Sequence, residues 1–215
     1  MELSAKLTER ARRGGRPCRA AAAGLRQAIL DAAEAIFLRE GFGGARMEAI
    51  AAAAGTTKQT LYTRFGSKAA LFIDVSNRLL EGRFVSTQIR EACLRDTLVA
   101  ASEEALAAML DPKLVRMYCI ITAEAVRFPE LARLSDEDRT FPGRLKMLAL
   151  LDSAVQSGEL ALADTRSAML MLQDLVLASP LRAAALGLEV LGPEERRARA
   201  EQAVDLFLNG ARPRR

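Results

Sequence analysis

Apolar residues recur along most of this chain at spacings of three and four, which is the period of an amphipathic α-helix. Within residues 25–40, one face carries Ile29, Ala33, Ile36 and Phe37, and the glycines that follow end the predicted helix. Ala and Leu dominate the composition, which favours helix, and no useful run of alternating β-branched residues predicts a strand. The pattern therefore predicts an all-α fold.

The same pattern predicts further helices after residue 68, separated by Pro, Gly and charged residues. A long amphipathic helix begins at Lys68 and continues towards Leu94. Pro180 is expected to kink or break the helix in which it lies, because Pro lacks a backbone N–H. The later segments are predicted at residues 98–110, 112–128, 129–134, 142–157, 164–186 and 193–209, with a charged loop at 135–140.

Residues 47–68 carry the signals of two short helices joined by a tight turn. An Ala-rich helix runs from Met47 to Ala54, Gly55 ends it, and Thr57 caps a second helix that runs through Phe65. Gly tolerates the left-handed backbone that often ends a helix, and a Thr hydroxyl accepts a hydrogen bond from an N–H of the first turn. Two helices arranged in this way form a helix-turn-helix pattern.

The second of these helices has two distinct faces. Leu61 and Phe65 lie four residues apart on the inward face. The other faces are polar, cationic and aromatic, which suits contacts with base edges and phosphates in a major groove; they carry Lys58, Gln59, Thr60, Tyr62, Thr63 and Arg64. An ordinary solvated helix has a similar composition, so this helix alone leaves both interpretations open.

Positive charge is concentrated at the N-terminal end of the chain. Residues 1–68 contain 12 Lys or Arg against 6 Asp or Glu, whereas the remainder contains 19 against 21. Arg13 and Arg16 belong to an Arg-Gly-Gly-Arg-Pro stretch, which is typical of arms that enter a narrow minor groove. The alternative is a disordered tail that attracts phosphates without specificity. Either way, the charge favours a polyanionic partner at this end.

Several classes of function are disfavoured. The chain has no His, and its three Cys, at positions 18, 93 and 119, have no metal-ligand spacing. Asp136 and Asp138 form a carboxylate pair, but they lie in a charged loop that is more simply solvated. We therefore expect no enzyme activity, no cofactor and no metal site. The odd Cys count and the absence of a signal-peptide or membrane-span pattern favour a cytoplasmic location.

The segments on either side of the helix-turn-helix extend the pattern to residues 26–75. Residues 29–42 read Ile-Leu-Asp-Ala-Ala-Glu-Ala-Ile-Phe-Leu-Arg-Glu-Gly-Phe, and residues 66–72 read Gly-Ser-Lys-Ala-Ala-Leu-Phe. Together they resemble the N-terminal DNA-binding domain of the TetR family of bacterial transcriptional regulators. Residues 114–131 are similar to the C-terminal domain of the AefR-like subset. The resemblance implies a basic arm at 1–24, a helix-turn-helix domain at 25–70 and a helical effector-binding and dimerisation domain at 71–215.

The resemblance also implies which residues contact double-stranded operator DNA. Lys58, Gln59 and Thr63 correspond to base-contacting positions, while Tyr62 and Lys68 correspond to phosphate-contacting ones. Where the family usually has a capping Thr or Ser, this chain has Arg46, which removes the hydroxyl but adds a cation for a phosphate. The full set of DNA-binding candidates is Arg13, Arg16, Arg46, Thr57, Lys58, Gln59, Thr60, Tyr62, Thr63, Arg64 and Lys68.

The C-terminal part is expected to hold a ligand pocket and a dimer interface. Flexible Met side chains suit an apolar pocket, although core packing is the simpler role for any single residue; the pocket candidates are Met109, Met117, Tyr118, Ile121, Met147, Leu151 and Met171. The polar groups that can orient a ligand are Tyr118, Glu124, Arg127 and Arg144. Family members dimerise through their last two helices, whose apolar faces here carry Met169, Leu172, Leu175, Val176, Ala203, Val204, Leu206 and Phe207.

These expectations combine into one functional hypothesis. The chain is expected to be a homodimeric repressor in the bacterial cytoplasm, bound to the nucleoid at a palindromic operator and released by a small apolar or amphipathic effector. Two heads about 34 Å apart can read two half-sites one DNA turn apart. Activation instead of repression fits the same sequence. The alternative class is a helical protein-interaction adaptor that lacks specific DNA binding.

Overall fold

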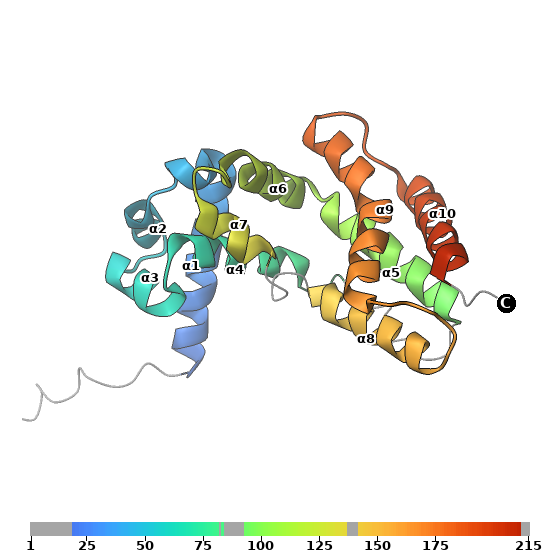
Figure 1. Ribbon diagram of the computed structural model, residues 1–215. Helices are drawn as coiled ribbons and strands as arrows, with labels where there is room; N and C mark the ends of the chain where they lie inside the picture. The colour runs from blue at the N-terminus through green and yellow to red at the C-terminus, as the bar shows by residue number, and fades with distance from the viewer. Residues whose placement is uncertain (1–18, 82, 84–92, 137–141, 212–215) are drawn as a thin grey trace, which may run out of the picture.

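The computed structural model describes residues 19–81, 83, 93–136 and 142–211. Ten helices lie within these residues, and no strand is found among them, which confirms the all-α prediction. The helices form two groups (Figure 1). One group, the head, contains the first four helices, and the other, the body, contains the fifth and the last three. Helices six and seven lie against the head, and helix six also contacts the body.

The head is built from α1 (Arg19–Gly44), α2 (Met47–Ala53), α3 (Lys58–Phe65) and α4 (Lys68–Leu80). The α1 span includes a break at Gly41, whose φ of 73° is left-handed, so the regular helix ends where the sequence predicted. Gly55 and Gly66, which follow α2 and α3, also have positive φ. Each of these turns therefore needs a backbone conformation that Gly adopts without a Cβ penalty.

Side-chain caps begin the two helices that follow those turns. The Thr57 hydroxyl accepts a hydrogen bond from the Thr60 backbone N–H at the start of α3. The Ser67 hydroxyl accepts one from the Ala70 N–H at the start of α4. Arg46 makes no capping hydrogen bond at the start of α2. The predicted helix-turn-helix is confirmed by these local interactions.

The core of the head includes residues from outside the N-terminal segment. Phe37, Phe42 and Phe72 form its centre, with ring centroids 5.0–6.2 Å apart. Met117 of α6 (Pro112–Glu124) and Leu131 of α7 (Pro129–Asp136) are buried in the same cluster. As a packing unit, the head therefore extends past the boundary predicted at residue 70 and includes most of α4.

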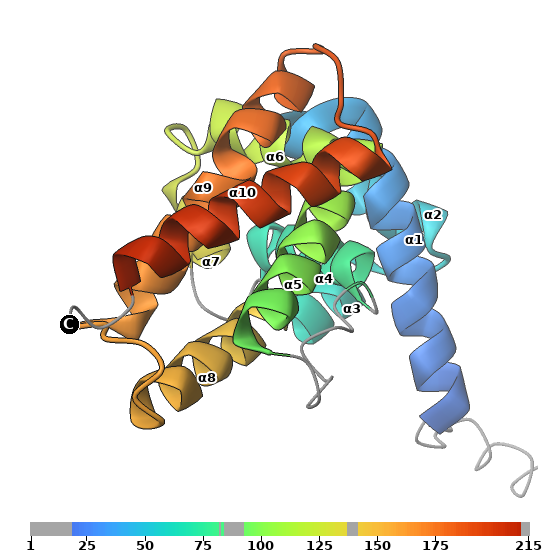
Figure 2. The same ribbon diagram turned by 90° about the vertical axis from the view of Figure 1, so that its right-hand side faces the viewer.

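The body consists of α5 (Leu94–Met109), α8 (Pro142–Gln156), α9 (Thr165–Ala185) and α10 (Pro193–Ala211). Figure 2 shows α10 crossing α5, with α9 beside both. Among the described helices, only α9 is long and apolar enough to cross a membrane by length and composition. Because α9 packs on α5, α6, α8 and α10, the same composition is that of a core helix.

Several predicted boundaries are wrong. Helix α4 ends at Leu80 instead of continuing towards Leu94, because Glu81 leaves the helical backbone with ψ at 134°; residues 84–92 lie outside the described part. Helix α5 begins at Leu94, four residues earlier than predicted, and α6 ends at Glu124 instead of the predicted residue 128. Helix α9 continues through Pro180, so of the predicted kink or break, the break is absent. Helix α7 takes in part of the predicted charged loop, and residues 137–141 are not described.

The apolar faces predicted for dimerisation are mostly inside the body. Their side chains belong to the core of the same chain, which α5 and α8 also supply; those buried are Met169, Leu172, Val176, Ala203, Val204 and Phe207. Leu206 is 63% exposed, and Leu175 is half-buried. The prediction was wrong for the buried residues because the most apolar stripe of each helix is used by the monomer.

Candidate DNA-binding surface and ligand cavity

The outward face of α3 is the most accessible part of the helix-turn-helix. Lys58, Gln59, Thr63 and Arg64 are exposed, and the Tyr62 side chain is 43% exposed. Within the described residues, Gln59 makes no side-chain hydrogen bond, nor does the Tyr62 hydroxyl. These groups keep their hydrogen-bonding capacity for a partner, as a helix that enters a major groove requires.

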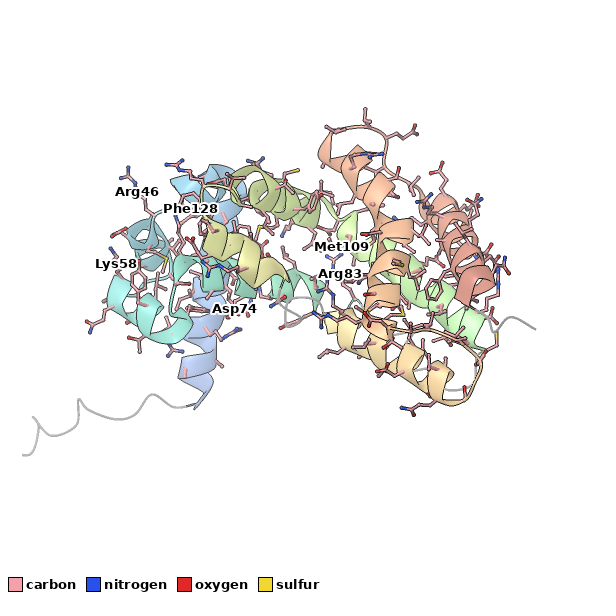
Figure 3. All side chains as sticks on the ribbon, in the orientation of Figure 1. Arg46, Lys58, Asp74, Arg83, Met109 and Phe128 are labelled. Atoms are coloured by element: carbon pink, nitrogen blue, oxygen red, sulfur yellow. The ribbon has the colours of Figure 1, made fainter. Side chains whose placement is uncertain are left out.

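Lys58 is paired with an acidic residue of the preceding helix. Its Nζ donates to Oε1 of Glu48 in α2 at 2.5 Å, and both side chains are at least half exposed. The hydrogen bond from Lys58 lowers the pKa of Glu48, and the same contact raises the pKa of Lys58. Nζ also lies 5.9 Å from the centroid of the Tyr62 ring. Lys58 lies on the outer side of the head (Figure 3), so its ammonium is exposed, but it is shared with the Glu48 carboxylate.

The three threonines among the DNA-binding candidates use their hydroxyls in hydrogen bonds within α3 and its cap. The hydroxyls of Thr57 and Thr60 lie 2.9 Å apart and hydrogen bond to each other at the start of α3. The Thr63 hydroxyl donates to the Gln59 carbonyl one turn earlier, at 2.9 Å. The hydroxyls of Thr57 and Thr60 therefore stabilise the start of the helix, while Thr63 lies on its exposed face.

The contacts of the Lys68 side chain differ from the phosphate contact that the sequence predicted. Its Nζ donates to the backbone carbonyls of Phe42 at 2.7 Å and Ala45 at 3.1 Å, and it lies 4.5 Å from the Phe42 ring centroid. Burial lowers the pKa of this ammonium, and the charges of Glu124 and Glu130 partly oppose that effect. The side chain is directed at the turn between α1 and α2, so a phosphate contact through the ammonium is not supported. The backbone at the start of α4 remains a candidate for such a contact.

The remaining cationic candidates fall in different places. Arg46 is exposed at the start of α2 and makes no side-chain hydrogen bond or ion pair within the described residues (Figure 3). Arg64 donates to the Ala22 carbonyl near the start of α1 at 3.3 Å. Arg13 and Arg16 lie outside the described residues. The structure therefore brings Arg46 and the exposed side of α3 together, while it leaves the arm undescribed.

Ion pairs and hydrogen bonds attach α6 to the head. Glu34 of α1 lies between Arg78 of α4, at 2.5 Å, and Lys113 of α6, at 2.6 Å. Burial alone raises the pKa of Glu34, but the hydrogen bonds and charges of Lys113 and Arg78 outweigh it, so the net shift is downward from 4.5. At the other end of α6, Oε2 of Glu124 accepts from the Gly43 N–H at 2.6 Å. Helix α6 is therefore fastened to the head at both ends.

A cavity of about 550 Å³ lies between the head and the body. Helices α4, α5, α6, α8 and α9 contribute to its wall, and Figure 3 shows Met109 in this central region. Its volume is in the usual range for small-molecule sites. The lining residues are Ile73, Ser76, Leu80, Met109, Leu114, Met117, Tyr118, Ile121, Arg144, Leu170, Gln173, Asp174, Leu177, Ala178, Leu181 and Arg182.

The predicted pocket residues are only partly on this wall. Those that line the cavity are Met109, Met117, Tyr118 and Ile121, together with the polar candidate Arg144. Met147 and Leu151 instead pack in the core of the body, and Met171 is 64% exposed on the outer side of α9. Glu124 binds the Gly43 N–H, and the Arg127 guanidinium lies over the Phe128 ring. These last five placements correct the sequence-based assignment, which rested on residue type without knowledge of facing.

Sequence reasoning placed Met171 of α9 in the pocket but missed the α9 residues that line the cavity. The lining positions recur at spacings of three and four along one face of the helix: Leu170, Gln173, Asp174, Leu177, Ala178, Leu181 and Arg182. A helical projection of α9 groups these positions apart from Leu172 and Val176, but it does not show which face meets a cavity. Within the described residues, no group of His, Cys, Asp or Glu could hold a metal ion.

The exposed α3 surface and the cavity-bearing helical body define a class of protein, the helix-turn-helix DNA-binding proteins with a ligand-binding domain. Comparison with protein families makes the assignment specific. The family described as "Bacterial regulatory proteins, tetR family" matches residues 29–75, and "AefR-like transcriptional repressor, C-terminal domain" matches residues 96–210. The chain belongs to the TetR family of bacterial transcriptional regulators and has an AefR-like C-terminal domain.

Individual relatives agree with this assignment. The HTH-type transcriptional repressor NicS of Pseudomonas putida is 43% identical over 81 residues, which cover 38% of this chain and only 36% of NicS. The flavonoid-responsive regulator FrrA is 30% identical, with a TM-score of 0.68 over 89% of this chain and 98% of FrrA. A TetR-family regulator from Mesorhizobium loti shares the fold, with a TM-score of 0.73, 23% identity, and coverage of 91% of this chain and 100% of its own.

Proposed function

We propose that this protein is a homodimeric repressor that binds a palindromic operator and is released by a small apolar or amphipathic effector. The observation that carries the proposal is the exposed, polar and aromatic face of α3, in which Gln59 and Tyr62 keep their polar atoms uncommitted within the described residues. Gln59 is placed to read a base edge, while Tyr62 and Arg46 contact phosphates. The name of NicS as a repressor supports the direction of regulation.

Dimerisation uses the sides of α9 and α10 that the monomer leaves exposed. Met171 on α9 is 64% exposed and Leu206 on α10 is 63% exposed. Exposed apolar side chains on adjacent helices are typical of an interface with a second copy. Replacement of both by Glu is expected to convert a particle of twice 23.3 kDa into one of 23.3 kDa in light scattering. Leu145→Glu, at a residue 61% exposed on α8, is the matched control and keeps the dimer.

The effector binds in the central cavity and acts through α6. The cavity is lined by Met117 and Tyr118 of this helix, while its Lys113 and Glu124 hold the head. A ligand that binds one position of α6 more tightly than another changes the separation of the two heads. Only such a difference in ligand affinity between the two positions can release DNA. FrrA, whose name describes it as flavonoid-responsive, is a relative that responds to a small molecule.

Fluorescence anisotropy with DNA from upstream of the protein's own gene tests the DNA-binding proposal. Saturable binding to this DNA, with at least tenfold weaker binding to a scrambled duplex, is expected. The double variant Gln59→Ala/Tyr62→Ala removes that preference, whereas the body variant Leu145→Ala/Gln156→Ala, at exposed positions of α8, retains it. Equal weak binding to both duplexes would reject the proposal and favour the protein-interaction adaptor.

A further inference from the structure

The polar groups of the central cavity are gathered on one side. Arg144 of α8 and Gln173, Asp174 and Arg182 of α9 line the wall formed by the body. The wall formed by α4, α5 and α6 is apolar apart from Tyr118 and Ser76, and the Ser76 hydroxyl donates to the Phe72 carbonyl. A ligand that fills the cavity therefore meets an apolar surface on one side and a charged surface on the other.

The charged wall carries two cations and one anion. Asp174 and Arg182 lie eight residues apart on the same side of α9 and line the cavity together. Within the described residues, neither side chain makes a hydrogen bond or an ion pair. A guanidinium presents a fork of N–H donors that matches the two oxygens of a carboxylate, so the Arg182 guanidinium beside the cavity favours a negative ligand group.

We propose that the cavity binds an organic monoanion, with one carboxylate held at the α8–α9 wall and an apolar body against α4, α5 and α6. This inference rests on the proposed function, since it names the chemical class of the effector at the same site. Arg182 binds the carboxylate, and Arg144 adds a second positive charge. Asp174 opposes a second carboxylate on the ligand and accepts from a hydroxyl or N–H group instead. A neutral ligand of the same shape offers the exposed Arg182 guanidinium no charge with which to pair.

Arg182 also lies at the junction between the cavity and the outer side of α9. Asp174, Ala178 and Arg182 line the cavity, and the same three residues border a shallow hollow that includes Met171 and Arg199. This hollow lies on the side proposed for dimerisation. A variant of Arg182 must therefore be checked for its oligomeric state before a change in ligand affinity is assigned to the lost guanidinium.

Calorimetry with ligands of one shape and different charge tests the proposal. At pH 7.5, titrations of the full chain use octanoate, octanamide and the eight-carbon dicarboxylate suberate, and a second series uses 2-naphthoate and 2-naphthamide. In at least one series the monoanion is expected to bind at least tenfold more tightly than its amide, and octanoate more tightly than suberate. Arg182→Gln is expected to reduce the acid-to-amide preference to within twofold. Arg127→Gln, at an exposed residue outside the cavity wall, is expected to preserve it.

Each other outcome has a definite meaning. Amides that bind as tightly as the acids, or an Arg182→Gln variant that keeps both the dimer and the acid preference, would overturn the assignment. Failure of both series to bind would also overturn it, and anisotropy with operator DNA then decides separately whether the regulatory function stands. If acid preference is retained in a protein that fails to bind upstream DNA, the ligand assignment stands and the proposed repressor function falls.

Discussion

The carboxylate of Glu124 accepts a hydrogen bond from the Gly43 backbone N–H at 2.6 Å, across 81 positions of the chain. Gly43 lies at the end of α1, after the break at Gly41 and just before α2, whereas Glu124 is the last residue of α6, the helix that also lines the cavity. A Cβ at position 43 would lie 2.6 Å from Oε2 of Glu124, so a larger residue there would force the carboxylate to move. The end of the cavity-lining helix α6 is thus fixed directly to the segment in front of the helix-turn-helix.

Removal of this carboxylate is expected to loosen the turn. Glu124→Ala removes the acceptor of the exposed Gly43 N–H, where water can partly replace it, so the cost is about 1 kcal/mol. Hydrogen–deuterium exchange should accelerate in the segment around residues 41–46 and stay unchanged in α10. Glu124→Gln, which keeps an acceptor oxygen, is the control and should show a smaller change. Equal exchange in all three proteins would contradict a role for this contact.

Lys68 is expected to be a structural residue of the head. Lys68→Ala removes a cation that binds two carbonyls and lies against Phe42, at a cost of about 2–3 kcal/mol. For a chain of this size, the melting temperature should fall by roughly 5–10 °C. Lys58→Ala, at the exposed end of α3, should change it by less than about 2 °C. A Lys68→Ala protein with unchanged melting temperature and weakened DNA binding would instead restore the predicted phosphate contact.

The pH dependence of stability should include a contribution from Glu34. Its pKa in the folded protein lies below 4.5, so the ionised form is favoured by folding. The resulting stability is present above about pH 4.5 and is lost as the pH falls through the folded-state pKa. Wild type should therefore melt above Glu34→Gln at pH 7, and the difference should narrow at pH 3.5. In a Lys113→Met background, which lacks one of the two cations, the effect of Glu34→Gln on the melting temperature should change less between pH 7 and pH 3.5. A melting-temperature difference that is independent of pH would contradict the ion-pair account.

Glu48 is expected to restrain DNA binding. It pairs with Lys58 and places a negative charge next to the phosphates of a bound duplex. Glu48→Gln frees the ammonium and removes the repulsion, so affinity should rise roughly threefold to tenfold at low salt and the gain should shrink as salt is added. Anisotropy titrations at 50 and 200 mM salt measure this change. Glu159→Gln, an exposed body residue, controls for net charge, and an equal effect of both variants would refute a local role for Glu48.

The sequence predicted the parts of the head that depend on local interactions. Gly55, Thr57 and Ser67 act within one helical turn of their own positions, so the two caps and the turn between α2 and α3 followed from residue type. Lys68 did not, because the carbonyls that hold it belong to Phe42 and Ala45, more than twenty positions earlier. Nothing in the local pattern distinguishes an exposed lysine from one that packs on a distant turn.

In the body, the sequence identified apolar helices but not the direction in which each face points. Helix α9 has a face in the core, a face on the cavity and an exposed side, and all three carry apolar residues: Leu172, Leu177 and Met171 respectively. A single amphipathic stripe cannot separate three such surroundings. The prediction therefore assigned the buried face of α9 to the dimer interface and placed Met171 in the pocket. In the structure, the cavity is lined by a different face of α9, the one that carries Leu177.

Hydroxyl-radical footprinting on the upstream DNA tests the central claim most directly, which is that two copies of α3 enter successive major grooves. The account predicts two clusters of protected backbone positions on one side of the duplex, about 34 Å apart, at protein concentrations that saturate binding. Gln59→Ala/Tyr62→Ala should abolish both clusters together. Uniform protection along the duplex, or clusters that persist in this variant, would contradict the account and leave only charge attraction between the basic end of the chain and DNA.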